Sequence, residues 1–114
     1  MSRGFTKKQW QQIKDRDGGC VWHGLACDQD TLVPQHRSGR GMGGDRSKNR
    51  LSNGVALCSR LNGLIESDAR MAEQARERGI KISLHADPAV LPVYYPDGSP
   101  WWLDDAGGKR GQPW

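Results

Sequence analysis

A strand signal leads directly into a helix signal near the middle of the chain. The four residues from Val55 to Cys58 are apolar, as is typical of a buried strand. Beyond them Leu61, Leu64 and Ile65 recur at intervals of three and one, which places them on one helix face. The sequence therefore predicts a strand followed at once by a helix that starts near Ser59.

Few residues are available to fill a core. The chain has 114 residues, of which 35% are hydrophobic and 15 are glycine. A chain of this length usually forms one domain, so we expect a single thin core that a metal or another cross-link would help to stabilise. Three cysteines cannot form a closed set of disulfides, and in a reducing compartment metal ligation or buried thiols are expected. The chain lacks a membrane-span signal and a signal-peptide core, which predicts a cytoplasmic protein without a membrane partner.

Capping and turn residues organise the N-terminal part. Thr6 is expected to cap a helix that runs to about Arg16 and ends at Asp17-Gly18-Gly19. The segment from Thr31 to Val33 is typical of a strand, which we expect Pro34 to stop because proline has no N–H to donate to a ladder. An N-terminal helix thus precedes the first strand.

The C-terminal half contains weaker signals. Ser67-Asp68 caps a further helix from Ala69 to Arg78, unless the two predicted helices are continuous. Alternation from Ile80 to Leu84 predicts a strand, and Asp97-Gly98 predicts the turn of a hairpin. We expect the polar, glycine-rich tail from Asp104 to Trp114 to be loose.

Positive charge is concentrated in a glycine-rich loop between Arg37 and Asn53. The whole chain has a formal net charge of +4. Against one acid, the loop carries five basic residues, namely Arg37, Arg40, Arg46, Lys48 and Arg50. This pattern predicts contacts with DNA phosphates, which would fix position on the duplex without reading its sequence. A solvated loop with no partner is the alternative.

Three polar residues then follow a characteristic spacing. His36 comes after a short strand, Asn53 lies seventeen positions later, and Asn62 lies nine positions after Asn53. Together with the lead-in from Arg16 to Cys20 and the segment from Leu51 to Cys58, this pattern resembles the HNH endonuclease motif over about residues 10–68. Taken whole, the chain is similar to the small free-standing HNH proteins of bacteriophages.

The resemblance implies an α+β fold with a small ββα-metal core, similar to a treble clef. Residues 1–79 would form this core with its N-terminal helix, and residues 80–114 would form a C-terminal β-hairpin extension packed on the same domain. The implied activity is metal-dependent hydrolysis of DNA phosphodiester bonds, by nicking or double-strand cutting, in phage genome packaging or homing. DNA and packaging proteins such as terminase or portal are the implied partners, in the cytoplasm of the host cell.

The resemblance also implies roles for individual residues. His36 suits a general base, since an ordinary histidine pKa of about 6.5 leaves the ring mostly neutral near pH 7. Arg37 would hold a phosphate oxygen through its planar fork. Asn53 would fix the loop and orient the His36 ring, and Asn62 would bind catalytic Mg²⁺ or Mn²⁺. Glu66 shares the helix face of Asn62, and we expect its carboxylate to assist at the metal.

Two positions depart from the family pattern. Gln35 stands where Asp or His is the common metal ligand, and Asn62 stands where His is commoner. Both amides are neutral and weaker ligands, so Gln35 and Asn62 would hold the ion less tightly. One alternative is therefore an HNH-fold protein that has lost turnover and binds DNA or a packaging protein. Another is a zinc-stabilised interaction domain unrelated to nucleic acid.

A second set of residues has metal-ligand chemistry. Zinc-bearing members of the family use two Cys-x-x-Cys pairs, and the four corresponding places here are Cys20, His23, Cys58 and Leu61. Leu61 cannot be a ligand, but Cys27 is an extra thiol nearby in the sequence. A structural zinc site of Cys20, His23, Cys27 and Cys58 follows, with a buried, unliganded Cys27 as the alternative.

Overall fold

The computed structural model describes residues 4–39 and 48–113. Its centre is an antiparallel hairpin of β1 (Leu32–His36) and β2 (Gly54–Cys58), in which His36 pairs with Gly54 at the end where the connecting loop leaves β1 and enters β2. β2 continues without a loop into α2 (Ser59–Ser67). The predicted strand and the predicted start of the helix at Ser59 are both confirmed.

β1 continues through Pro34, so the prediction that this residue stops the strand is wrong. Pro34 pairs with Ala56 in the hairpin register. β1 has a neighbouring strand on one side only. An edge strand accepts proline where the missing N–H would have pointed away from the partner strand.

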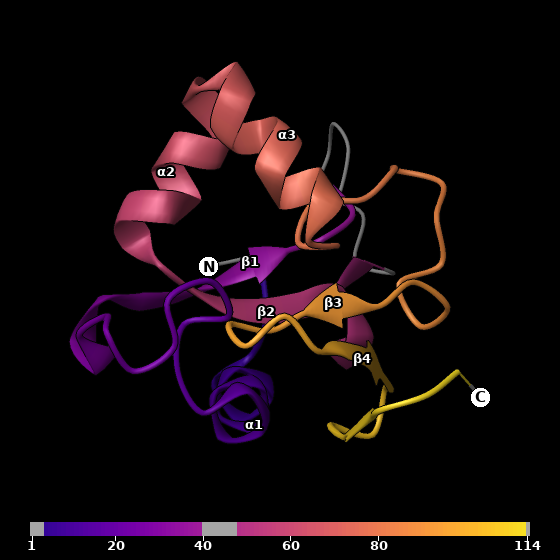
Figure 1. The fold of residues 1–114 in the computed structure, drawn as a ribbon. Coiled ribbons are helices and arrows are strands. Elements are labelled where there is room, and N and C mark those ends of the chain that lie inside the picture. Colours follow the sequence, from indigo (N-terminus) through magenta and orange to yellow (C-terminus); the bar gives the residue numbers. More distant parts are fainter. Residues whose placement is uncertain (1–3, 40–47, 114) are drawn as a thin grey trace.

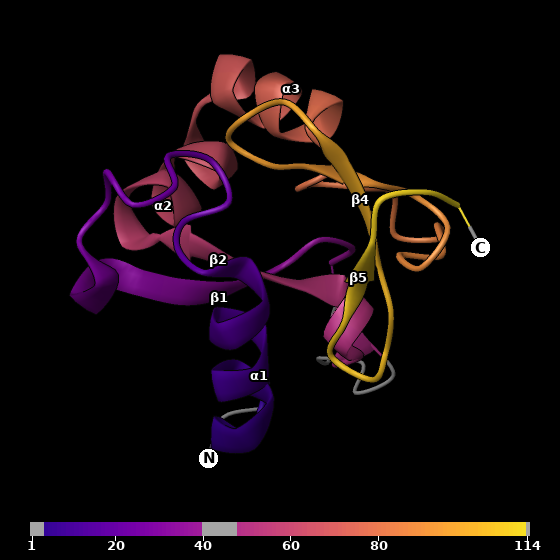
Figure 2. The same ribbon diagram turned by 60° about the horizontal axis from the view of Figure 1, so that its bottom comes forward.

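The predicted N-terminal helix is confirmed as α1 (Lys7–Asp17). The Thr6 hydroxyl accepts from the Gln9 N–H at 3.1 Å, and the Gln9 side chain accepts from the Thr6 N–H at 2.9 Å. This reciprocal capping satisfies two N–H groups that have no partner inside the helix. The helix ends at Gly18, whose φ of 70° favours glycine. α1 and α2 lie on opposite faces of the hairpin (Figure 1; Figure 2).

Two separate helices follow the hairpin, which settles the alternatives that the sequence left open. α3 (Ala69–Glu77) begins after Asp68, whose carboxylate accepts from the N–H groups of Arg70 and Met71. Asp68 itself has an extended backbone conformation. The chain therefore turns there instead of continuing α2, as Figure 1 shows.

The C-terminal segment forms a second, three-stranded sheet. Its strands are β3 (Val93–Tyr94), β4 (Pro100–Leu103) and β5 (Lys109–Arg110), in that spatial order. The turn predicted at Asp97-Gly98 is confirmed, since the Gly98 N–H donates to the Tyr95 carbonyl at 2.8 Å.

Two expectations for this segment are wrong. The alternating residues from Ile80 to Leu84 form no strand, because Ile82 makes only an isolated bridge with Ser38. The tail beyond Asp104 is not loose over its whole length, because β5 pairs with β4. In both cases a segment forms a strand only where another strand lies beside it, and the local pattern of apolar and polar residues does not reveal that neighbour.

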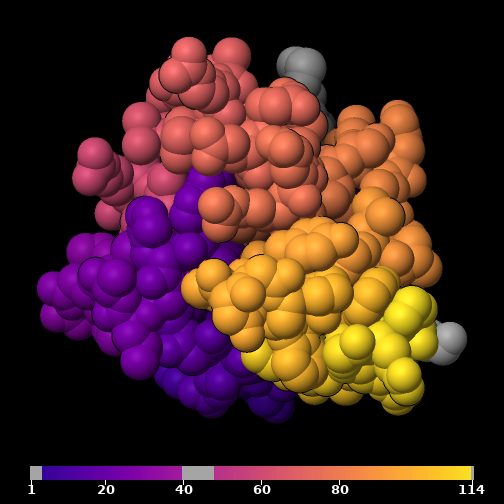
Figure 3. All heavy atoms as spheres, viewed as in Figure 1, coloured from indigo at the N-terminus to yellow at the C-terminus, as the bar shows by residue number. Residues whose placement is uncertain are grey.

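The two sheets and three helices of the described residues share one core. Val93 and Leu103 of the second sheet are fully buried in the same apolar cluster as Val55 and Leu57 of β2. Figure 3 shows the C-terminal segment packed directly against the N-terminal part of the chain. The fold is thus an α+β domain. Within the described residues, none of the helices has the length and apolar character needed to cross a membrane.

Candidate functional site

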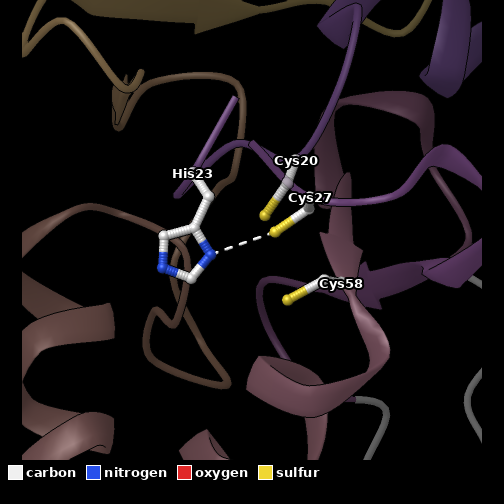
Figure 4. Close-up of side chains that lie close together, drawn as sticks. All are labelled: Cys20, His23, Cys27 and Cys58. Carbon is white, nitrogen blue, oxygen red and sulfur yellow. Dashed lines mark hydrogen bonds between the residues drawn. The ribbon is translucent and has the colours of Figure 1, made fainter. Parts of the chain in front are cut away.

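Four side chains with metal-ligand chemistry meet beside the hairpin. Cys20, His23 and Cys27 come from the segment after α1, and Cys58 ends β2. One potential ligand atom from each residue lies within 4.8 Å of all the others. Figure 4 shows the three sulfur atoms and the His23 ring gathered around one point. This cluster could hold a metal ion.

The backbone between the first two ligands forms a tight loop against β2. The Cys20 N–H donates to the Gly24 carbonyl at 3.2 Å, and the Gly24 N–H donates back to Cys20 at 2.6 Å. The Val21 N–H donates to the Ala56 carbonyl of β2 at 2.9 Å. Gly24 has a φ of 65°, a conformation that glycine adopts without strain. These bonds hold the loop close to the end of β2, where Cys58 lies.

The spacing of the four ligand atoms suits tetrahedral coordination. Zinc–sulfur bonds of about 2.3 Å place the sulfur atoms of a tetrahedral site roughly 3.8 Å apart, and the ligand atoms of this cluster all lie within 4.8 Å of one another. His23 Nδ1 lies 3.1 Å from Cys27 Sγ, so this nitrogen already faces the sulfur atoms. Desolvation and the neighbouring sulfur atoms of Cys58 and Cys20 raise the pKa of the Cys27 thiol to about 12. A bound cation has the opposite effect, because it stabilises thiolates.

Gln35 and Asn62 meet between β1 and α2. The Asn62 amide donates to Gln35 Oε1, and the Gln35 amide donates to the His36 carbonyl at 2.8 Å. Gln35 is buried, and Asn62 is half-buried. Gln35 and Asn62, two of the three residues expected at the catalytic ion, therefore lie together.

Glu66 is not part of this pair. Its carboxylate lies 3.6 Å from the Lys81 ammonium group, and its side chain is 61% exposed. Glu66 thus forms a surface ion pair with Lys81, and the expectation that it assists at the metal has no contact to support it.

His36 points to the other face of the hairpin. Its ring stacks on Phe5, with centroids 4.5 Å apart and an interplanar angle of 16°. His36 Nε2 lies 2.7 Å from Asn49 Oδ1. Neighbouring residues of a strand point to opposite faces, so His36 faces α1 whereas Gln35 faces α2. The predicted general base, His36, and the predicted metal ligand, Gln35, are therefore consecutive residues whose side chains lie on opposite faces of the hairpin.

Asn53 closes the loop between the two strands. Its side-chain oxygen accepts from the Ser38 N–H at 2.8 Å, and its amide donates to the carbonyls of Ser38 at 3.0 Å and Lys48 at 2.8 Å. Asn53 is fully buried. It thus ties together the two described ends of the loop. The described side-chain bonds of Asn53 go to Ser38 and Lys48, and the His36 ring has a described contact with Asn49, so the expectation that Asn53 orients the ring stays a prediction.

Arg37 is a structural residue, which overturns its assignment to a phosphate oxygen. The residue is 1% exposed. Desolvation and the nearby charge of Arg16 lower the pKa of Arg37 to about 10, which leaves it protonated at neutral pH. Its guanidinium donates to carbonyl oxygens from three segments, those of Gly79, Ser52, Pro88, Leu91 and Pro92.

The remaining basic residues of the loop divide into two groups. Arg40 and Arg46 lie outside the described residues. Lys48 and Arg50 line a surface pocket of about 190 Å³. The Lys48 ammonium donates to the Ser38 hydroxyl at 3.0 Å and to the Leu84 carbonyl. Arg50 forms ion pairs with two aspartates, Asp87 at 3.3 Å and Asp105 at 2.8 Å, so much of its charge is balanced.

Sequence reasoning missed Phe5 and Asn49, which contact the His36 ring within the described part of the chain. Both are far from His36 along the chain and follow no spacing that marks them. No protein-family model, curated protein or solved structure matches the chain. The fold and the site define an α+β domain with a Cys/His cluster that could hold a metal ion.

Proposed function

We propose that Cys20, His23, Cys27 and Cys58 bind one structural zinc ion. Three thiols and an imidazole are the donor types that zinc prefers, and four protein ligands make a closed structural site. The cluster links the loop after α1 to the end of β2, where α2 begins. A zinc ion there would cross-link the loop to the hairpin and add to the backbone bond between Val21 and Ala56.

We propose further that the hairpin and α2 form an HNH-type site that hydrolyses DNA phosphodiester bonds. The observation that carries this proposal is the contact between Asn62 and Gln35, on the strand that ends with His36. It joins helix and strand at the two positions that the resemblance assigns to the catalytic ion. Gln35 and His36 are consecutive on β1 but face opposite sides of the hairpin, so in this proposal the phosphate binds across the end of β1 to contact both side chains.

In this proposal His36 takes the proton of the attacking water. The amide oxygens of Gln35 and Asn62 are hard donors of the type that Mg²⁺ accepts, but they carry no charge. The negative charge around the ion must therefore come from the DNA phosphate itself. When bound, the ion would offset charge that develops on the phosphate and on the leaving oxygen. Divalent-ion binding is consequently expected to be weak without DNA.

A specific observation supports a second candidate, a DNA-binding domain without turnover. Within the described residues, no group of three or more His, Cys, Asp or Glu side chains forms at Gln35 and Asn62. The nearest candidate carboxylate in sequence, that of Glu66, pairs with Lys81. Such a domain would bind DNA in a salt-sensitive manner without cleaving it.

One experiment separates the two candidates. Supercoiled plasmid is incubated with the full-length protein in Mg²⁺, Mn²⁺ or EDTA, beside His36→Ala and the control Gln11→Ala on the exposed face of α1. Hydrolysis predicts metal-dependent nicking that His36→Ala loses and Gln11→Ala keeps. An inert parent that shifts DNA in a salt-dependent manner would support the binding domain, and a parent that does neither would contradict both candidates.

A further inference from the structure

The ring of His36 is held by two residues that no motif marks. Asn49 contacts its edge through Oδ1, and Phe5 covers its face. Both come from segments on the α1 side of the hairpin. The Gln9 amide of α1 donates to the Asn49 carbonyl at 3.1 Å, which fixes the backbone of Asn49 against the helix.

The hydrogen bonds of Asn49 determine which ring nitrogen of His36 carries the proton. Asn49 Nδ2 donates to the Gly4 carbonyl, with 3.4 Å between the two atoms. A carbonyl only accepts, so the amide nitrogen must face Gly4 and the amide oxygen must face His36. That oxygen also only accepts, so His36 Nε2 must be the donor. In the neutral ring, Nδ1 is then the nitrogen that can take up a proton.

The stack on Phe5 depends on a glycine at the opposite strand position. Gly54 pairs with His36 across the hairpin. A Cβ atom at Gly54 would lie 2.6 Å from Phe5 Cζ and 2.7 Å from Ile13 Cδ1, closer than carbon atoms can approach. The glycine thus leaves the space in which Phe5 packs between α1 and the His36 ring.

From these contacts we propose that Asn49 is the positioning residue of His36. It holds the ring as the Nε2–H tautomer, while Phe5 fixes the ring plane, so that Nδ1 is the proton acceptor. The catalytic meaning of this arrangement rests on the proposed hydrolysis, but the arrangement itself can be tested without DNA.

The first test is an NMR measurement on ¹⁵N-labelled full-length protein. An imidazole N–H held in a hydrogen bond exchanges slowly with water and gives a one-bond ¹H–¹⁵N signal, which His36→Gln identifies by its loss. At about pH 8.5, roughly two units above the ordinary histidine pKa, the ring is neutral. The parent is expected to show the Nε2–H signal of His36. Asn49→Ala should lose it, and Asn49→Asp, which keeps an acceptor oxygen, should retain it.

Two further variants separate positioning from general loss of structure. Asn62→Ala lies on the other face of the hairpin and should retain the signal. Phe5→Leu keeps an apolar side chain but removes the aromatic ring, so the carbon-bound protons of His36 should lose the upfield shift that a stacked ring causes. A parent without a protected Nε2–H, or an Asn49→Ala protein that keeps it, would overturn the proposal.

The second test is cleavage by the same proteins. Asn49→Ala is expected to lower kcat on the order of 10- to 100-fold with little change in KM, because a misplaced base reduces the rate more than it reduces binding. Asn49→Asp should restore part of the loss. If the parent protein does not cleave DNA, the proposed hydrolysis fails, while the NMR result still decides the role of Asn49.

Discussion

Tyr95 donates a hydrogen bond to the carboxylate of Asp17, across the boundary between the C-terminal sheet and the end of α1. Asp17 also accepts from Arg16 Nε and from the Ala56 N–H, both at 2.8 Å. Arg16 in turn donates to the Leu51 carbonyl at 2.9 Å. Burial and the charge of Asp17 raise the pKa of Tyr95, which keeps its phenol protonated as a donor. One buried carboxylate thus connects helix, hairpin and extension.

Tyr95→Phe is expected to lower the free energy of unfolding by about 1.5–3 kcal/mol, the range for a hydrogen bond to a charged group. Tyr94→Phe is the matched control, because Tyr94 is the neighbouring residue and is 39% exposed. Its effect should stay within about 0.5 kcal/mol. Urea unfolding measures both. If the two substitutions lower the free energy of unfolding by the same small amount, the hydrogen bond from Tyr95 to Asp17 does not contribute to stability.

Arg37→Lys distinguishes a structural arginine from a phosphate-binding one. Lysine keeps the charge but has three donors on a single nitrogen, whereas Arg37 donates from all three nitrogens of its guanidinium, so some of the buried carbonyls would lose their partner. We expect a loss of about 3–5 kcal/mol in the free energy of unfolding, comparable with breaking a buried pair. Unchanged unfolding together with weaker DNA binding would instead return Arg37 to the role of a phosphate ligand.

Cys27→Ser tests the fourth member of the metal cluster. Zinc affinity should fall by at least about 100-fold, since changes to residues that merely support a ligand already cost about 10- to 100-fold. Leu25→Ser is the control, because Leu25 lies in the same loop, is 81% exposed and has no ligand atom. Competition with a chromophoric chelator gives both affinities. Equal affinities for parent and Cys27→Ser would leave Cys27 a packed thiol outside the site.

Asp105→Asn should reveal a pH-dependent contribution to stability. Partial burial alone would raise the pKa of Asp105, but hydrogen bonds from Ser52 and the ion pair with Arg50 lower it. A carboxyl whose pKa is lowered on folding stabilises the fold above its unfolded pKa of about 3.9, and the effect is lost as pH falls through the folded value.

The Asp105 side chain is nearly half exposed, so the expected effect at pH 7 is less than about 1 kcal/mol. Thermal unfolding of parent and Asp105→Asn across the acid range measures it. The difference in stability should shrink as the pH falls below the unfolded pKa. A difference that stays constant over the same range would show that the charge of Asp105 contributes nothing.

Local chemistry made part of the fold predictable. Thr6 and Gly18 mark the ends of α1 through bonds made within a few residues, and Asp97-Gly98 marks a turn in the same way. The apolar run before Ser59 similarly predicted β2 and the start of α2. Each of these signals depends on neighbours in sequence, which a single chain displays directly.

The features that the sequence did not predict depend on contacts between residues far apart along the chain. The position of Arg37 next to His36, in a basic loop, predicts a phosphate contact, but the acceptors of its guanidinium include the carbonyls of Gly79 and Pro88, far along the chain. Alternation at Ile80–Leu84 predicts a strand, but a strand also needs a partner, and among the described residues this segment has just one isolated bridge, between Ile82 and Ser38. The chemistry of Cys27 and its nearness in sequence make it a candidate ligand, but its position beside the other ligands depends on the path of the loop.

The metal content of the protein tests the central claim, that a metal centre organises the hairpin and its helix. The full-length protein would be purified without added metal, desalted and measured by native mass spectrometry and elemental analysis. We predict one zinc ion per chain, absent from the Cys58→Ser variant. A folded parent with less than about a tenth of an equivalent of zinc would contradict the account, because a closed four-ligand site binds zinc too tightly to lose it on desalting.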